Sequence, residues 1–312
     1  MQTNTEAKPM TYKLTLWEKV KKKRTYYGMM APFLLIFTVF TVAPVVMSFF
    51  LSFTNFDMLQ APSFIGLDNY THLFLNDDVF LIALKNTVIL ALITGPISYL
   101  LAFVIAWLIN ELPRKIRWLM VLIFYAPSIS GSAFLLWRLI FSSDMYGYLN
   151  AYLIEWDLIN TPILWLKTPE YALAILIIVQ LWMSLGVSFL AFIAGLQTVD
   201  RSLYEAAAID GIRNRWQELW YITLPQMKSQ LMFGAVLQIT QALGIGMISI
   251  QLLGFPSVEY SGHTIITHLM DFGSTNSTRL EMGYASAVAT ILFVMMLGSN
   301  LLIQKIIRRV GT

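Results

Sequence analysis

Long uncharged, mostly apolar stretches alternate along the chain with short polar segments. Six stretches contain no Asp, Glu, Lys or Arg, namely 25–56, 86–110, 118–137, 171–199, 229–258 and 282–304. A helix needs about 20 apolar residues to cross the hydrocarbon of a membrane, because each residue rises about 1.5 Å and every backbone group must be paired. The pattern therefore predicts six membrane-spanning helices, at approximately 28–53, 85–110, 118–141, 171–197, 229–254 and 283–306.

The composition agrees with a protein whose surface faces lipid. Hydrophobic residues make up 57% of the 312 residues and charged residues only 12%, whereas a soluble domain has about 25% charged residues. The absence of cysteine excludes disulfides, thiolate catalysis and cysteine-ligated metals. Because the three histidines (His72, His263 and His268) are scattered in the sequence, we expect neither a metal site nor catalytic residues.

The positive charges predict how the chain is threaded through the membrane. Lys and Arg concentrate in residues 1–27, in every second connection and in the C-terminal tail. The exceptions are Lys85, Arg138, Lys167 and Arg279. Because cytoplasmic segments retain positive residues, we expect both termini in the cytoplasm, and contact of the basic run 19–24 with anionic lipid rather than nucleic acid. The chain would then consist of a basic cytoplasmic segment, 1–27, and one six-span domain, 28–310.

Smaller features are expected around the spans. Residues 15–24 favour an amphipathic helix on the membrane surface. Residues 258–282 have the apolar spacing of a short helix on the outer mouth, although a packed loop fits the same pattern. Pairs of Gly and Pro residues mark either hinges or places of close helix packing. These pairs are Gly95 with Pro96, Gly244 with Gly246, and Gly254 with Pro256.

The spans lack the residues that ion-coupled transport would need, and the chain lacks the motif that ATP binding would need. Ion-coupled transporters place ionisable residues at mid-membrane, and the uncharged stretches have none. The phosphate-binding pattern Gly-x-x-x-x-Gly-Lys-Ser/Thr is also absent from the sequence. If the protein moves a solute uphill, a separate subunit must therefore supply the energy.

Uncharged polar residues gather on faces of the spans instead. The fifth span carries a stripe of Gln238, Gln241 and Ser249, and the fourth carries Gln180 and Ser184, with Trp182 nearby on another face. The third contributes Tyr125 and Ser128 around Pro127. Amides and hydroxyls are suitable partners for sugar hydroxyls, and an aromatic ring offers a stacking surface. Either these residues line a substrate pathway, or they join helices by interhelical hydrogen bonds.

The sequence of the connection 200–225, which is expected to be cytoplasmic, predicts a helix, a turn and a second helix. Asp200 or Ser202 can cap a first helix, Gly211 supplies the turn, and a second helix at 216–222 should end before Pro225. Such a structured loop suits a docking partner, although a helix packed on its own bundle would give the same pattern.

The motif within this connection resembles the EAA loop of permease subunits in binding-protein-dependent ABC importers. The matching residues are Glu205-Ala206-Ala207, Gly211 and Ile222-x-Leu224-Pro225. The resemblance implies that Glu205, Ala206, Ala207, Asp210 and Gly211 form a coupling helix that docks on the ATPase, and that Leu224 and Pro225 fix the return to the membrane. One departure is that ten residues separate Gly211 from Ile222, where the family has nine, so the turn at 212–215 would be longer.

Further segments are similar to the maltose-type permeases of carbohydrate uptake transporter family 1. They are the Ala31-Pro32 and Pro44 region, Phe64 to Tyr70, Asn86-Thr87, Tyr125-Ala126-Pro127 and Gly283 to Ala287. Phe64 to Tyr70 is similar to the first permease of the pair in such systems. The resemblance implies an all-α, type I permease fold in a bacterial or archaeal cell membrane. It also implies a second permease subunit, two ATP-binding subunits and an extracellular solute-binding protein.

The expected function is inward transport of a sugar or oligosaccharide by alternating access. This chain would bind no cofactor, since ATP and Mg²⁺ would be used by the partner ATPase. Two alternatives stay open: an ABC permease for another solute, such as a polyol, glycerol phosphate or a peptide, and an ATP-independent channel or facilitator.

Overall fold

The computed structural model describes residues 15–273 and 280–309, and these are helical apart from loops and one isolated bridge between Thr54 and Phe64. The all-α class expected from the sequence is confirmed. The chain divides into two compact units, Met1–Phe50 and Leu51–Thr312, and each unit is considered by itself.

The first unit contains a short helix followed by a long apolar one. α1 (Leu16–Lys22) falls in the region expected to be helical and begins with a capping box. The Thr15 backbone N–H donates to Glu18 Oε2 at 2.9 Å. α2 (Arg24–Phe37), the π-helical η1 (Thr38–Val42) and α3 (Ala43–Leu51) then form one run of 28 residues, which is long enough to cross a membrane.

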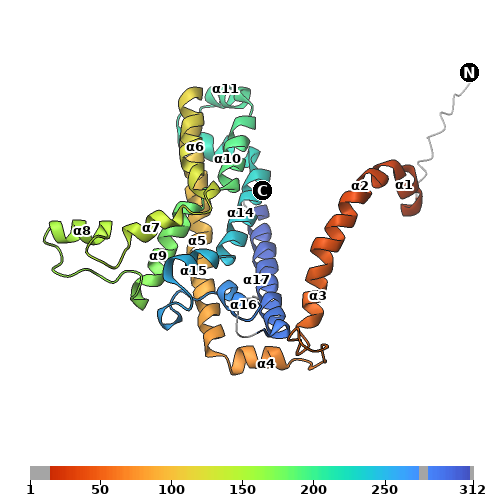
Figure 1. The fold of residues 1–312 in the computed structure, drawn as a ribbon. Helices are drawn as coiled ribbons and strands as arrows, with labels where there is room; N and C mark the ends of the chain where they lie inside the picture. Colours follow the sequence, from red (N-terminus) through yellow and green to blue (C-terminus); the bar gives the residue numbers. More distant parts are fainter. Residues whose placement is uncertain (1–14, 274–279, 310–312) are drawn as a thin grey trace, which may run out of the picture. The chain divides into compact units, whose positions relative to one another are not determined.

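The second unit is a bundle of long helices with short helices at its ends and along its side (Figure 1). The longer helices are α5 (Asp78–Asn110), α6 (Arg114–Ile129), α9 (Pro169–Met183), α10 (Val187–Thr198), α14 (Lys228–Leu243) and α17 (Met282–Arg309). The shorter ones are α4 (Asp68–Leu75), α7 (Phe134–Ile140), α8 (Tyr148–Glu155), α11 (Arg201–Ile209), α12 (Arg215–Glu218), α13 (Leu224–Gln226), α15 (Met247–Leu253) and α16 (Ile265–Gly273), with the π-helical η2 (Leu219–Thr223) and the 3₁₀-helical η3 (Val258–Tyr260). In Figure 1, α11 lies at one end of this unit, and α4 and α16 lie toward the other. The two ends are named the α11 end and the α16 end.

Helices α5, α10 and α14 pack on one another in the centre of this unit. Phe192 of α10 is fully buried, and its ring lies 5.5 Å from that of Tyr99 and 5.7 Å from that of Phe103, both on α5. A Cβ on Gly234 of α14 would lie only 2.3 Å from the Phe192 ring. Glycine at 234 is therefore what allows α14 to approach α10 so closely.

Helix α5 is one continuous helix of 33 residues, which corresponds to a length of about 50 Å. It begins at Asp78 rather than near residue 85, because the Asp77 side chain caps it by accepting the Phe80 N–H at 2.8 Å. The helix passes through Gly95 and Pro96 without a break. A Cβ on Gly95 would lie 3.5 Å from Ile239 Cδ1, which is an ordinary contact distance, so packing does not require glycine at this position, and the unbroken helix shows no hinge there.

Three of the expected spans are interrupted. α6 and α7 are bent by 82° and α14 and α15 by 44°, while α9 and α10 are separated at residues 184–186. Four helical stretches of the described chain can cross a membrane unaided, or up to six if each bent pair is one span. The segment expected to span the membrane at 118–141 corresponds to the bent pair α6 and α7, and its crossing as one span stays a prediction. Pro127 lacks an N–H and Ser130 is extended, so the helix ends at Ile129.

The other interruptions agree with the glycine pattern in part. α14 ends at Leu243 and α15 starts at Met247, so Gly244 and Gly246 do mark a break. The short helix expected between residues 258 and 282 is also present as α16.

Candidate functional site

The start of α11 is fixed by its own sequence. The Asp200 side chain accepts the Ser202 N–H at 3.0 Å, and hydrogen bonds from the Ser202 backbone and side chain hold the pKa of Asp200 below its ordinary value. Arg201 and Glu205 form an i,i+4 ion pair at 3.4 Å, with side chains that are 92% and 70% exposed. Such exposed pairs contribute little to stability, so Glu205 is available to a partner.

The end of α11 is a Schellman motif. The Ile212 N–H donates to the Ala207 carbonyl at 2.9 Å, and the Gly211 N–H donates to the Ala208 carbonyl. Gly211 has a φ of +97°, which glycine adopts without the strain that a Cβ would introduce. The segment from Asp200 to Gly211 is therefore a helix with both ends specified.

Large apolar side chains are exposed around α11. Ile209 is 88% exposed, Trp220 60% and Tyr221 73%, whereas Ala207 faces inward. None of the three exposed residues lies in a membrane-spanning stretch. Exposed apolar residues gathered in one loop are typical of a surface that docks on a partner.

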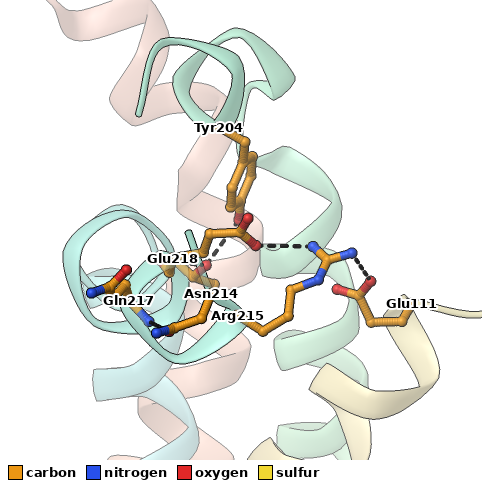
Figure 2. Close-up of polar contacts among 7 residues, drawn as sticks. Glu111, Tyr204, Asn214, Arg215, Gln217 and Glu218 are labelled. Carbon is orange, nitrogen blue, oxygen red and sulfur yellow. Dashed lines mark hydrogen bonds and ion pairs between the residues drawn. The ribbon is translucent and has the colours of Figure 1, made fainter. Parts of the chain in front are cut away.

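A polar network joins α11, α12 and the end of α5 (Figure 2). The Arg215 guanidinium contacts the carboxylates of Glu218 and Glu111, each at 2.9 Å. The hydrogen bond that Arg215 donates to Glu218 and the charge of Glu111 both raise the pKa of Arg215 above its ordinary value. The Tyr204 hydroxyl of α11 lies 2.9 Å from Thr223 Oγ1 of η2. These contacts bind the loop together around α11.

The second helix of the loop differs from the expectation. Residues 215–226 are helical throughout as α12, η2 and α13, so the helix does not end before Pro225. Pro225 directly follows the π-helical turn η2 and interrupts the backbone hydrogen bonding there, because it has no N–H to donate. A π-helical turn holds one residue more than an α-helical turn, so η2 offers a place for the additional residue between Gly211 and Ile222.

The residues assigned to coupling thus fall into two groups. Glu205, Ala206, Ala207, Asp210 and Gly211 form one unbroken stretch of α11 and its C-cap, while Leu224 and Pro225 lie in α13. Their role in coupling stays a prediction.

The interrupted helices meet at a cavity of 390 Å³ in the second unit. Its lining comes from α6 and from the residues at the α9/α10 and α14/α15 breaks, namely Tyr125, Ser128, Gln180, Met183, Gly186, Val187, Gln241, Gly244, Ile245, Gly246, Met247 and Ile248. A Cβ on Gly186 would lie 3.6 Å from Ser128 Cβ and 4.0 Å from Gln241 Nε2. Three elements that are distant in sequence therefore converge on Gly186.

Four of the eight residues offered for a substrate pathway line this cavity, namely Tyr125, Ser128, Gln180 and Gln241. Gln180 is buried, and its Oε1 has no hydrogen-bond partner within the described part of the chain. Gln241 lies across the cavity and is exposed to it. A buried amide oxygen without a partner is costly, so Gln180 carries a polar group that its described protein neighbours leave unsatisfied.

The other four predicted pathway residues make contacts away from the lining. Gln238 bonds to Ser184 O and Ser188 Oγ, Ser249 Oγ donates to Gly262 O, and the Trp182 ring packs 5.7 Å from that of Trp137. These contacts match the interhelical alternative, and a pathway role for Trp182, Ser184, Gln238 and Ser249 stays a prediction.

Sequence reasoning missed several cavity residues. Met183, Val187, Met247 and Ile248 line the cavity only because the helices break beside them. The usable signals were the neighbouring glycines: Gly186 in the fourth uncharged stretch, and Gly244 and Gly246 in the fifth.

An all-helical membrane unit with broken helices around a polar cavity defines a solute permease. Residues 19–312 match the family described as "Binding-protein-dependent transport system inner membrane component", and the chain belongs to this family. It is 35% identical to the probable ABC transporter permease protein YesP of Bacillus subtilis (strain 168), over 86% of this chain and 85% of YesP. It is 30% identical to the lactose transport system permease protein LacF of Rhizobium radiobacter, over 85% of this chain and 88% of LacF.

Solved structures agree with this assignment. The chain is similar to a permease of a bacterial ABC transporter involved in the import of the acidic polysaccharide alginate, with a TM-score of 0.74 and 26% identity over 95% of this chain and 99% of the other. The match to the alginate transporter in complex with a pentasaccharide-bound periplasmic protein has a TM-score of 0.73 and 25% identity, over 95% and 98% of the two chains. The chain is thus a multi-pass permease component of an ABC importer, as the sequence predicted.

Proposed function

We propose that this chain is one of two permease subunits in a bacterial or archaeal ABC importer that moves a sugar or oligosaccharide inward. Two separate ATP-binding subunits, which use ATP and Mg²⁺, dock on α11 at the cytoplasmic face. An extracellular binding protein delivers the solute at the α16 end. This chain itself binds no cofactor.

The cavity at the three helix breaks carries the proposal. It combines two amides, a hydroxyl and a tyrosine ring with apolar side chains, and no Asp, Glu, Lys or Arg is in its lining. Amides and hydroxyls pair with sugar hydroxyls, while apolar and aromatic surface suits the faces of a pyranose ring. Two similar proteins also support a carbohydrate as the solute. LacF is named as a lactose transport permease, and the similar solved structure is described as a transporter that imports alginate.

Helix breaks at the cavity also supply a physical basis for alternating access. Backbone groups at the α14/α15 break are not held by a continuous helix ladder, so the two halves of that span can tilt separately. Closure of the ATPase dimer would move α11, and the spans attached to it would open the cavity toward the binding protein. Because the two sites bias one equilibrium, the loaded binding protein should in turn stimulate ATP hydrolysis.

Reconstitution of the permease pair, its ATPase and its binding protein in vesicles tests the proposal. We expect ATP-dependent uptake of the sugars that the binding protein retains, and loss of uptake with Glu205→Ala. The matched control is Glu155→Ala, an exposed glutamate in the last turn of α8, which should transport normally. Solute flux through vesicles that lack the ATPase would instead favour a facilitator, and retention of polyols or peptides by the binding protein would favour the other ABC substrates.

A further inference from the structure

The loop that contains α11 touches α5, a helix to which it is not joined in the chain. Glu111 is the residue that follows α5, and its carboxylate lies 2.9 Å from Arg215. One turn before the end of α5, the Trp107 ring lies 5.4 Å from that of Trp216. One ion pair and one aromatic contact therefore connect α5 directly to α12.

Arg215 is well placed to transmit movement of the loop. Its guanidinium is held between Glu218 of its own helix and Glu111 of α5 (Figure 2). A planar fork that pairs with two carboxylates has a defined orientation. The Tyr204–Thr223 hydrogen bond connects α11 to η2, which directly follows α12 in the chain. A shift of α11 is thus passed to Arg215 and from there to α5.

The opposite end of α5 is attached to the segment that precedes α16. Asn86 Nδ2 donates to three backbone carbonyls between residues 260 and 263, the nearest being that of His263 at 2.9 Å. Thr87 Oγ1 accepts the Ile265 N–H at 2.9 Å. The Asn86–His263 and Thr87–Ile265 hydrogen bonds are buried, so they are costly to break. Helix α5 is therefore a continuous rod with a fixed contact at each end.

We propose that the Glu111–Arg215 pair is a positioning contact that carries movement of α11 into α5, and through α5 to the segment 257–265 at the α16 end. This route acts beside the covalent route, in which α10 and α14 are pulled by the loop that joins them. The inference rests on the proposed function. It adds α5 as the element that links the ATPase to the outer mouth.

The test uses the complete transporter in vesicles with the sugar that its binding protein retains, and measures sugar transported per ATP hydrolysed. Glu111→Gln and Arg215→Gln should each lower this ratio about two- to fivefold, because an exposed ion pair stabilises by up to about 1 kcal/mol. The double variant should be no worse than Arg215→Gln alone, because the contact with Glu111 is already lost in that variant. Arg215→Lys keeps the charge and should recover part of the ratio.

The matched control is Arg213→Gln, an exposed arginine two residues away with no ion pair among the described residues, which should match the parent.

A second measurement follows α5 itself. Because the chain has no cysteine, spin labels can be placed at introduced cysteines replacing Leu81 near the α16 end of α5 and Leu158 after α8, both exposed. In the parent, a non-hydrolysable ATP analogue should shift the distance between the labels, and Glu111→Gln should reduce this shift.

The outcomes separate the two proposals. Equal transport ratios in Glu111→Gln, Arg215→Gln and the parent, additive losses in the double variant, or an equal loss in Arg213→Gln would each overturn the role of the pair. In those cases the parent's ATP-dependent uptake would still support the proposed function. Absence of any ATP-dependent uptake by the parent would reject the proposed function and, with it, the positioning role.

Discussion

Gln238 Nε2 donates to Ser188 Oγ at 2.6 Å and to the Ser184 carbonyl at 3.0 Å, so one amide of α14 holds both sides of the α9/α10 break. Gln238 is 2% exposed, and its partners have no access to water as a substitute. The two interrupted spans are therefore fastened together beside the cavity rather than left free.

Because these two hydrogen bonds are buried, we expect replacement of Gln238 to lower the stability of the complex. Gln238→Leu keeps the side-chain size and leaves Ser188 Oγ and the Ser184 carbonyl without this donor, which should cost about 1–3 kcal/mol. The measurement is thermal unfolding of the purified permease complex in detergent. Gln60→Leu, at an exposed glutamine, is the control, and an equal melting temperature for the two variants would contradict the role of Gln238.

The cavity glutamines predict a different effect. Gln180→Leu and Gln241→Leu each remove one hydrogen-bonding group from the lining, so the KM for uptake should rise about two- to tenfold, as for a net loss of 0.5–1.5 kcal/mol. Gln180→Leu should at the same time leave the complex as stable as the parent or more so, because it removes an unsatisfied buried amide oxygen. Gln304→Leu, outside the cavity, should have the parent's KM. An unchanged KM in both cavity variants would remove the glutamines from the pathway.

Local signals were enough to predict the long apolar helical stretches and α11, but not the breaks within those stretches. The uncharged stretches located the membrane helices because the hydrocarbon tolerates no unpaired charge over that length. Asp200 and Gly211 located the ends of α11 because a cap depends on a few neighbouring residues.

The contacts across the bundle could not be predicted in the same way. Gln238 and Gln241 lie on one stripe of α14, yet Gln238 binds α10 and Gln241 faces the cavity. Periodicity assigns both glutamines to one face of the helix. Only the break at residues 184–186 determines that one amide bonds to protein and the other lines the cavity. Hydropathy also conceals such breaks, because Ser, Gly and Pro are uncharged.

Gly211 predicts a graded effect on coupling. No atom lies within 4 Å of a Cβ placed at this glycine, so a substitution acts through backbone strain and not through a clash. At a φ of +97°, Gly211→Ala should cost about 1 kcal/mol of loop stability and Gly211→Val more, with Gly211→Asn the mildest. ATP hydrolysis stimulated by the loaded binding protein should fall in the order Gly, Asn, Ala, Val. If Val and Asn gave the same rate, strain at Gly211 would not govern the loop.

His263 predicts that the α16 end loses stability in mild acid. The side chain is 2% exposed, and its Nε2 lies 3.4 Å from Nδ1 of His268, which in turn lies 3.2 Å from Asp77. Burial, followed by repulsion from His268, lowers the pKa of His263 to about 4, and the opposing attraction of Asp77 is smaller. The unfolded histidine takes up a proton near its ordinary pKa of 6.5, whereas the folded one stays neutral.

Stability contributed by neutral His263 is therefore complete above pH 6.5 and is lost as the pH falls toward 4, by up to about 3 kcal/mol, since one pKa unit corresponds to about 1.4 kcal/mol. The melting temperature of the purified complex, measured from pH 7.5 to 4.5, should fall through this window. His263→Phe keeps a ring next to Phe255, whose own ring lies 5.8 Å from that of His263, and cannot take up a proton, so its melting temperature should fall less. An equal fall in the parent and in His263→Phe would show that acid acts on other groups.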